Sequence, residues 1–156
     1  TIAKKLLQHE RKFISNFGLA AAMGSKKDVV SLAKKHFGED EGKISNPIFR
    51  SKVIDHKMKE HAFGLTLQRA ADEGGKASAV ASMFKYYGTE HNKKRHELMV
   101  AASGVNGLAW DGNEFDDSEK NLTRSWLRTK GNSIEGGTSE VQLNVISKRV
   151  LELPSG

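Results

Sequence analysis

The fold is decided by residues 46–75, which read NPIFRSKVIDHKMKEHAFGLTLQRAADEGG. Asn46 is a favourable helix N-cap, and Pro47 suits the first helical position, where its missing N–H would have no helical partner anyway. Apolar residues then recur at helical spacing and predict one core-facing stripe of Ile54, Met58, Ala62 and Leu65. Gly74 and Gly75 end the pattern. The stretch therefore predicts one long amphipathic helix.

The sequence on either side shows the same period. Residues 1–24 predict a helix with an apolar stripe of Ile2, Leu6, Phe13, Phe17 and Ala20. Residues 26–36 predict a short helix that ends near Phe37 and Gly38, and residues 38–45 predict a loop. A second long helix is predicted from residue 76 to about 104, with one face made by Val80, Phe84, Tyr87, His91, Leu98, Ala102 and Val105.

Two more helices are predicted near the C-terminus. An acidic loop over residues 111–117 leads into a helix capped by Asp117 or Ser118 that runs to about Lys130. Residues 131–137 break the pattern, and Thr138 or Ser139 then caps a last helix with a core stripe of Leu143, Ile146 and Val150. Long helices joined by short turns predict an all-α helical bundle, and 156 residues fit a single domain.

The composition excludes several classes of protein. The chain has no cysteine, which excludes a disulfide scaffold, cysteine zinc sites and a cysteine nucleophile. This absence fits a reducing compartment, and we expect a cytoplasmic location. No apolar run approaches the ~18 residues that a membrane span needs, which predicts no membrane partner. The chain opens on Thr1 inside a helical pattern, so we expect it to be a piece of a longer protein.

The charge balance is basic, with 25 Lys+Arg against 19 Asp+Glu. A basic chain can attract nucleic acid. Here the lysines are scattered, and no stacking aromatic residues are interleaved with them. We therefore expect a solvated helical surface and no nucleic-acid partner.

Glu10 is the most informative single residue. It lies at the centre of the first apolar stripe, between Leu6 and Phe13. A carboxylate there must be buried, paired or functional. Burial disfavours the charged form of a carboxyl group, which suits a general base that works near neutral pH. The alternative is an ion pair with a lysine or arginine of a neighbouring helix.

The second candidate is the glycine-containing turn at residues 134–140, which reads IEGGTSE. Its two glycines allow a ligand to approach the backbone closely. Thr138 and Ser139 offer hydroxyls at a helix start, a natural seat for phosphate. Helix capping alone would also explain both residues.

Other constellations fail on spacing. His56 and His61 lie five residues apart, as do His91 and His96, and neither pair shares a helix face in a known zinc pattern. His91, on an apolar stripe, is better interpreted as a core or interface histidine. The acidic loop lacks the glycine and glutamate positions of a calcium loop. We therefore expect no metal site.

Residues 134–154, IEGGTSEVQLNVISKRVLELP, closely resemble the C-terminal signature of acyl-CoA dehydrogenases. Residues 6–11, LLQHER, resemble the start of the same family's C-terminal domain. The resemblance covers essentially the whole chain. It is most specific from Arg128 onward and weakest between Ser25 and Lys120.

The resemblance implies a four-helix-bundle-like third domain of a flavoenzyme, with a helical domain and a β-domain before Thr1. Family members act in fatty acid metabolism. They remove the α-proton of an acyl-CoA with a glutamate, pass the β-hydride to FAD and release an enoyl-CoA. Electrons then go to an electron-transferring flavoprotein. Subunits form dimers or tetramers through this bundle, so we expect a homo-oligomer.

The resemblance also suggests roles for individual residues. Many members place the catalytic glutamate directly before Gly-Thr-Ser, where this chain has Gly136, and Glu135 is one residue too early. Another branch carries the base in a Glu-Arg pair on the first helix, which Glu10 and Arg11 match. The substrate contacts implied by the family are Gln8, Arg11 and Gly137. The implied FAD contacts are Thr138, Ser139, Glu140, Lys34 and His36.

Two departures weaken the implied FAD site. The family's Arg-x-x-Phe-Gly motif is represented by residues 34–38, KKHFG, and its Gln-x-x-Gly-Gly motif by residues 101–105, AASGV. The arginine and the glutamine are therefore replaced. A non-catalytic helical oligomerisation module, or a divergent subunit of the same fold, remains the rival interpretation.

Overall fold

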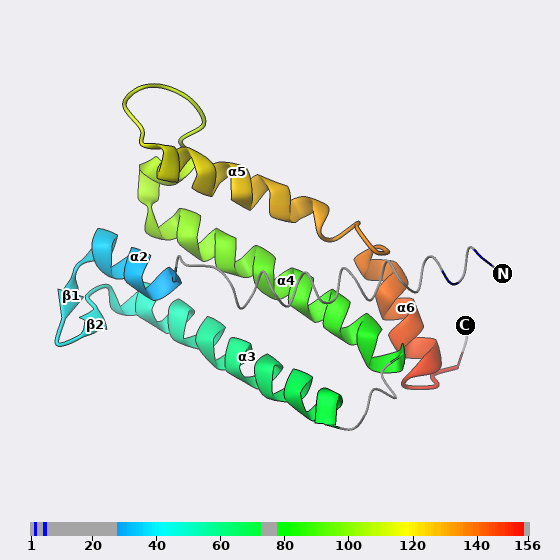
Figure 1. The fold of residues 1–156 in the computed structure, drawn as a ribbon. Coiled ribbons are helices and arrows are strands. Elements are labelled where there is room, and N and C mark those ends of the chain that lie inside the picture. The colour runs from blue at the N-terminus through cyan, green and yellow to red at the C-terminus, as the bar shows by residue number, and fades with distance from the viewer. Residues whose placement is uncertain (1, 3–4, 6–27, 73–77, 155–156) are drawn as a thin grey trace. The chain divides into compact units, whose positions relative to one another are not determined.

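The computed structural model describes residues 2, 5, 28–72 and 78–154 (Figure 1). The predicted helix over residues 1–24, with Glu10, Gln8 and Arg11, lies outside the described residues except for Ile2 and Lys5. The described α-helices are α2 (Val29–Phe37), α3 (Pro47–Asp72), α4 (Ser78–Ala102), α5 (Asp117–Gly131) and α6 (Ser139–Arg149). A 3₁₀ helix, η1 (Gly104–Leu108), follows α4. The prediction of an all-α fold is confirmed.

The chain divides into two compact units. The first, Ser25–His61 with His91–Lys130, contains α2, the start of α3, the end of α4, η1 and almost all of α5, and we call it the hairpin unit. The second includes Ala62–Glu90 and the chain from Gly131 onward, with α6, and we call it the tail unit. Within residues 28–72 and 78–154, no helix combines the length and apolar character that a membrane crossing requires.

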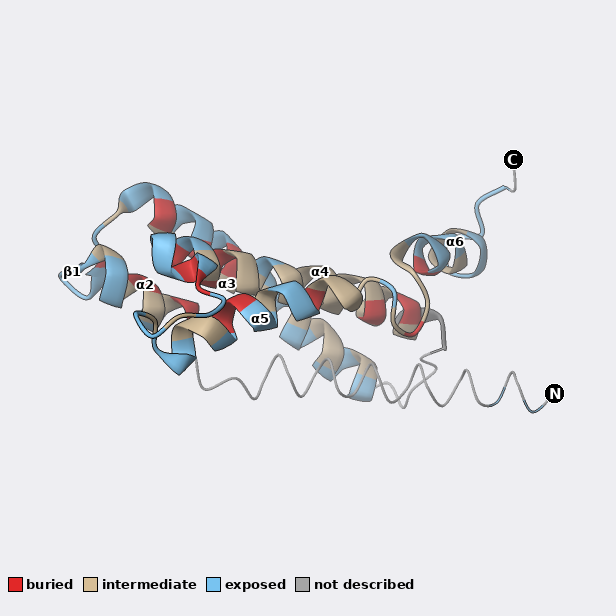
Figure 2. Ribbon diagram, turned by 90° about the horizontal axis from the view of Figure 1, so that it is seen from above, coloured by how far each residue is buried: buried red, intermediate tan, exposed pale blue. Residues whose placement is uncertain are grey.

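The core of the hairpin unit is apolar and comes from α2, α3, α4 and α5, with Ile44 added from the segment between α2 and α3. Figure 2 shows buried positions on these helices. The buried set is Val29, Ala33, Ile44, Phe49, Val53, Leu98, Met99, Ala102 and Leu122. The ring of Phe37 packs on that of Phe49 with centroids 4.7 Å apart, so α2 is fixed against the start of α3.

The start of α3 follows the local sequence. The Asn46 side chain accepts a hydrogen bond from the Phe49 N–H at 2.9 Å, which confirms the predicted N-cap. The segment before it is a small hairpin rather than the predicted loop: β1 (Glu39–Asp40) pairs antiparallel with β2 (Lys43–Ile44). Glu41 and Gly42 join the strands with φ angles of 46° and 77°. Two positive φ angles in a two-residue turn match a hairpin.

The predicted cap of α5 is wrong by one or two residues. The Asp116 carboxylate, not Asp117 or Ser118, accepts hydrogen bonds from the N–H groups of Ser118 and Glu119, at 2.7 and 2.9 Å. The Glu119 side chain in turn accepts from the Asp116 N–H at 3.0 Å. This reciprocal pair of hydrogen bonds is a capping box, in which the N-cap residue lies three positions before the glutamate.

The predicted stripe on α3 is also wrong. Ile54, Met58 and Leu65 are 52%, 68% and 54% exposed, and Ala62 is exposed too. The buried face instead carries Phe49, Val53 and His56. Both faces of this helix carry apolar residues, so periodicity alone does not show which one meets the core.

Three other predicted core positions are exposed. Val105 is 80% exposed, because α4 ends at Ala102 and the chain turns into η1. Leu143 on α6 and Val150, the C-cap of that helix, are 45% and 41% exposed, and α6 buries Gln142 instead. In the tail unit, the Phe63 ring packs on Phe84 and Tyr87, with centroids 5.9 and 5.0 Å apart.

Candidate functional site

The turn before α6 has a backbone that requires glycine. Gly136 and Gly137 have φ angles of 66° and 101°. A Cβ atom added at Gly137 would lie 2.7 Å from Nε2 of Gln142, which is closer than side chains approach. The two glycines are therefore fixed by local geometry before any ligand is considered.

The buried side chain of Gln142 holds this turn in place. Its side chain is 1% exposed, and its Nε2 donates a hydrogen bond of 2.9 Å to the Gly136 carbonyl. The Gly137 N–H donates to the Ile134 carbonyl at 3.2 Å. A buried amide that satisfies a turn carbonyl gives the turn one conformation, since losing that bond would leave a buried acceptor unpaired.

The N-terminus of α6 is capped by the chain itself. The Thr138 hydroxyl oxygen accepts from the Val141 N–H at 3.3 Å, which confirms Thr138 as the N-cap. The Ser139 N–H donates to the Ser133 carbonyl at 3.1 Å. The start of this helix therefore offers fewer N–H groups to an anion than the sequence argument assumed.

Two acidic residues lie at the same turn. The Glu90 carboxylate is 3.3 Å from the Ser133 hydroxyl and 3.4 Å from the Ser139 hydroxyl, and both hydroxyls donate to it. A hydrogen bond from its own N–H, and one from Thr138, lower the pKa of the Glu140 carboxyl. Negative charge repels phosphate, so this turn suits a ligand group that donates hydrogen bonds better than it suits a pyrophosphate.

The remaining predicted residues are spread over both units. Glu135 accepts a hydrogen bond from Asn132 Nδ2 at 3.0 Å, which fixes its carboxylate beside the end of α5. Lys34 and His36 belong to the hairpin unit, in the last turn of α2, where Lys34 pairs with Glu39 at 3.3 Å and His36 is exposed. The tail unit thus brings together Glu135, Gly137, Thr138, Ser139 and Glu140.

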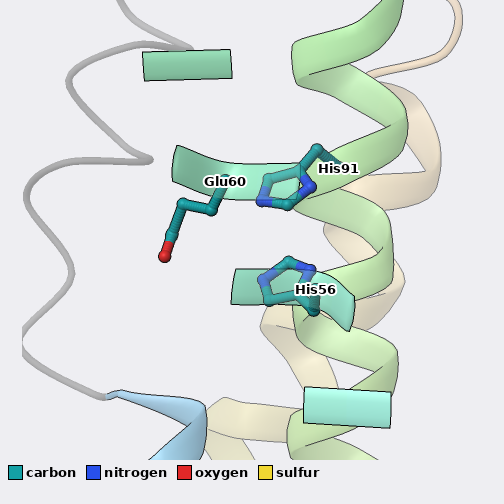
Figure 3. Close-up of side chains that lie close together, drawn as sticks. All are labelled: His56, Glu60 and His91. Atoms are coloured by element: carbon teal, nitrogen blue, oxygen red, sulfur yellow. The ribbon is translucent and has the colours of Figure 1, made fainter. Parts of the chain in front are cut away.

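A second cluster, which the sequence analysis did not identify, lies in the hairpin unit. His56 and Glu60 are one turn apart on α3, and His91 is on α4 (Figure 3). The potential ligand atoms of the three side chains all lie within 4.8 Å of one another. The rings of His56 and His91 stack with centroids 4.0 Å apart and an angle of 8° between their planes.

Both imidazoles are held in the neutral form. Burial, with the nearby His91, lowers the pKa of His56 to about 4. Burial also lowers the pKa of His91, against the opposing effect of Glu60. The sequence did contain one sign of this cluster: His56 and Glu60 are four residues apart, which places them on one face of a helix. Considering only pairs of histidines overlooks this spacing.

Comparison with known proteins identifies the family. The family model described as acyl-CoA dehydrogenase, C-terminal domain, matches residues 1–151. The chain therefore belongs to the acyl-CoA dehydrogenase family and corresponds to its C-terminal domain. The helical architecture agrees with this assignment.

Two curated relatives carry the name acyl-CoA dehydrogenase IpdE1. The protein from Mycobacterium tuberculosis is 26% identical over 127 residues, and that from Mycolicibacterium smegmatis is 24% identical over 128. Each alignment covers 81% of this chain but only 31% and 30% of the relative. The chain thus spans about a third of the length of these relatives.

A solved structure shares the fold. The crystal structure of the ChsE4-ChsE5 complex from Mycobacterium tuberculosis matches with a TM-score of 0.66 and 20% sequence identity. The match covers 82% of this chain and 34% of that one.

Proposed function

We propose that this chain is the C-terminal domain of an FAD-dependent acyl-CoA dehydrogenase that converts an acyl-CoA thioester into an enoyl-CoA. The observation that carries the proposal is the family match over residues 1–151. The printed names of the two relatives support it, since both are acyl-CoA dehydrogenases. Residues 1–156 alone are expected to be inactive, because the relatives are about three times as long as the matched segment.

The proposed α-proton base is Glu10. Its place on an apolar stripe, directly before Arg11, supports this role. Glu135 is the second candidate and is less suitable, because Asn132 already binds its carboxylate and because it lies one residue before Gly136. Gln8, Arg11 and Gly137 are the proposed substrate contacts.

FAD is the proposed cofactor, and when bound it would accept the β-hydride of the substrate. Thr138, Ser139 and Glu140 would hold its polar part, with Lys34 and His36 as weaker contacts. The fit depends on which part of the flavin is considered. Glu90 and Glu140 favour hydroxyl donors such as the ribityl or ribose groups over the pyrophosphate. An electron-transferring flavoprotein is the proposed electron acceptor.

The test is flavin reduction by acyl-CoA in the full-length protein, followed by anaerobic rapid mixing. Glu10→Gln should slow flavin reduction by at least ~100-fold, the low end of what a positioned general base contributes. Glu135→Gln should have a milder effect. If Glu135→Gln abolished reduction while Glu10→Gln stayed within a few-fold of wild type, the assignment of the base would be reversed.

The rival function is a non-catalytic helical oligomerisation module or divergent subunit. The replaced arginine and glutamine in the two FAD motifs favour it. Retention of oxidised flavin by the purified full-length protein separates the two functions, because a bare module would be colourless. Flavin retention without bleaching by any acyl-CoA would favour the divergent subunit.

Self-association is proposed for either function. Ile54 and Met58 are more than half exposed on α3, while Phe49 and Val53 on the same helix fill the core. Exposed apolar side chains at helical spacing favour a partner surface, and the matching structure is itself a complex. Sedimentation at high concentration should therefore show dimers or larger species, and a strictly monomeric profile would contradict this.

A further inference from the structure

The cluster of His56, Glu60 and His91 joins two helices of the hairpin unit. His56 and Glu60 lie four residues apart on α3, which places both side chains on one face, and His91 reaches them from α4. Two residues of one helix with a third from its neighbour is a common way to build a metal site inside a helical bundle.

His56 provides an independent reason to look for a ligand. Its side chain is 2% exposed, and within the described part of the chain neither Nδ1 nor Nε2 makes a hydrogen bond. Buried polar groups are normally hydrogen-bonded, because an unpaired one costs about 1–3 kcal/mol. A metal ion bound by one ring nitrogen would remove much of that cost.

The protonation state suits metal binding. Metal ligands must be neutral imidazoles or ionised carboxylates, and burial keeps both histidines neutral at physiological pH. A cation therefore need not displace a proton from either ring.

Neighbouring cationic side chains compete with a metal ion for the Glu60 carboxylate. Lys57 Nζ lies 2.8 Å from the Glu60 carboxylate and 3.0 Å from that of Asp28, and Lys59 pairs with Asp55. The half-buried Arg95 adds a further positive charge near both rings. An incoming ion would take Glu60 from Lys57, and Lys57 would keep its ion pair with Asp28.

We propose that His56, Glu60 and His91 form a binding site for a divalent transition metal ion, with Zn²⁺ the ion that fits best. Two imidazoles and one carboxylate suit Zn²⁺ and do not suit Ca²⁺ or Mg²⁺, which prefer oxygen ligands. Three protein ligands leave one coordination position for water. The bound ion would join α3 to α4 inside the hairpin unit.

Binding requires a local change. A tetrahedral ion with bonds of about 2.0–2.1 Å holds its ligand atoms roughly 3.3 Å apart, whereas these atoms span up to 4.8 Å. The stacked rings must also turn, because parallel planes do not direct their nitrogen lone pairs at one point. The proposal therefore requires the three side chains to rotate when the ion binds.

The test is Zn²⁺ binding by the full-length protein after chelator treatment, measured by calorimetry against a competing chelator. One ion should bind per chain, and Co²⁺ in its place should give the visible absorption of a tetrahedral ion. At a free Zn²⁺ concentration 100 times the Kd, the unfolding midpoint of the full-length protein should rise by roughly 3 °C.

Paired variants identify the site. His56→Phe keeps an aromatic ring on His91 but removes a ligand, and Glu60→Gln removes the carboxylate charge at a partly exposed position. Each should weaken binding by at least ~10-fold. Asp55→Asn, the matched control on the same helix, and His61→Gln, an exposed histidine, should leave the Kd unchanged.

Two results would overturn the proposal. One is the absence of one-to-one binding at micromolar free Zn²⁺. The other is that Glu60→Gln and His56→Phe bind Zn²⁺ as tightly as wild type, or that the control variants weaken Zn²⁺ binding as much as these two do. Glu60→Gln keeps the test decisive even if His56→Phe does not fold. The result is independent of flavin or acyl-CoA chemistry.

Discussion

The turn before α6 and the histidine pair between α3 and α4 differ in whether their buried polar side chains are hydrogen-bonded. At the turn, the buried Gln142 amide pairs with a carbonyl six residues away, and Thr138 caps its own helix. In the pair, His56 is as deeply buried but has no hydrogen bond among the described residues. The turn is thus complete without a ligand, whereas the two ring nitrogens of His56 have no hydrogen-bond partner among the described residues and could accept a ligand.

The largest expected effect is a loss of stability in acid, which acts on the histidine pair. Burial lowers the pKa of His56 to about 4, below the 6.5 of the unfolded chain. The unfolded state therefore takes up its proton first as the pH falls, so this contribution to stability is complete above pH 6.5 and is lost towards pH 4. The loss should total about 3 kcal/mol, with about 2 kcal/mol gone at pH 5. Denaturant unfolding in chelator from pH 7.5 to 4.5 measures it.

The control for this effect is His56→Phe, which keeps an aromatic ring and removes the titration. Its unfolding free energy should fall less steeply with acid than that of wild type. Part of the slope should remain, because burial also lowers the pKa values of His91 and His96. An unchanged slope in the variant would show that the neutral burial of His56 is not the source.

The next largest expected effect is a loss of stability when the turn before α6 is distorted. Gly137→Ala places a side chain at a φ of 101° and a Cβ atom against the amide that holds Gly136. Backbone strain and the displaced Gln142 hydrogen bond should together cost about 2 kcal/mol. Denaturant unfolding at pH 7.5 measures this cost.

Gly64→Ala is the matched control. Gly64 is an interior residue of α3, and no atom lies within 4 Å of an added Cβ. That substitution should stabilise the protein by about 0.5–1 kcal/mol, since alanine is the better helix former. Equal effects of the two substitutions would show that the turn geometry does not matter to stability.

The two regions also differ in how well the sequence predicts them. The turn and its helix were predicted because their signals are local: two glycines, then Thr138 three residues before the N–H that it caps. The same holds for Asn46 and Pro47 at the start of α3. Capping depends on residues within one turn of each other, so a single sequence contains the whole argument.

The pair was missed because it forms only when two helices pack. His56 and His91 are far apart in sequence, and which faces of α3 and α4 meet depends on tertiary structure. The wrong choice of the Ile54 stripe has the same origin, since both faces of α3 are apolar. The hairpin at residues 39–44 was missed because two-residue strands are too short to show an alternating pattern.

The smallest effect should sharpen the view that the turn is complete by itself. Thr138→Ala removes the side chain that caps α6, and the lost bond is long, at 3.3 Å, and solvent-exposed. The expected cost is therefore about 0.5–1 kcal/mol, towards the low end for an N-cap, and Thr138→Asn should restore most of it. Denaturant unfolding at pH 7.5 measures both variants. If Thr138 only caps the helix, flavin retention in the full-length protein should follow stability, so that Asn rescues both. If Thr138 also contacts FAD, Thr138→Asn should restore stability while flavin retention stays impaired, because the longer amide places its polar atoms elsewhere.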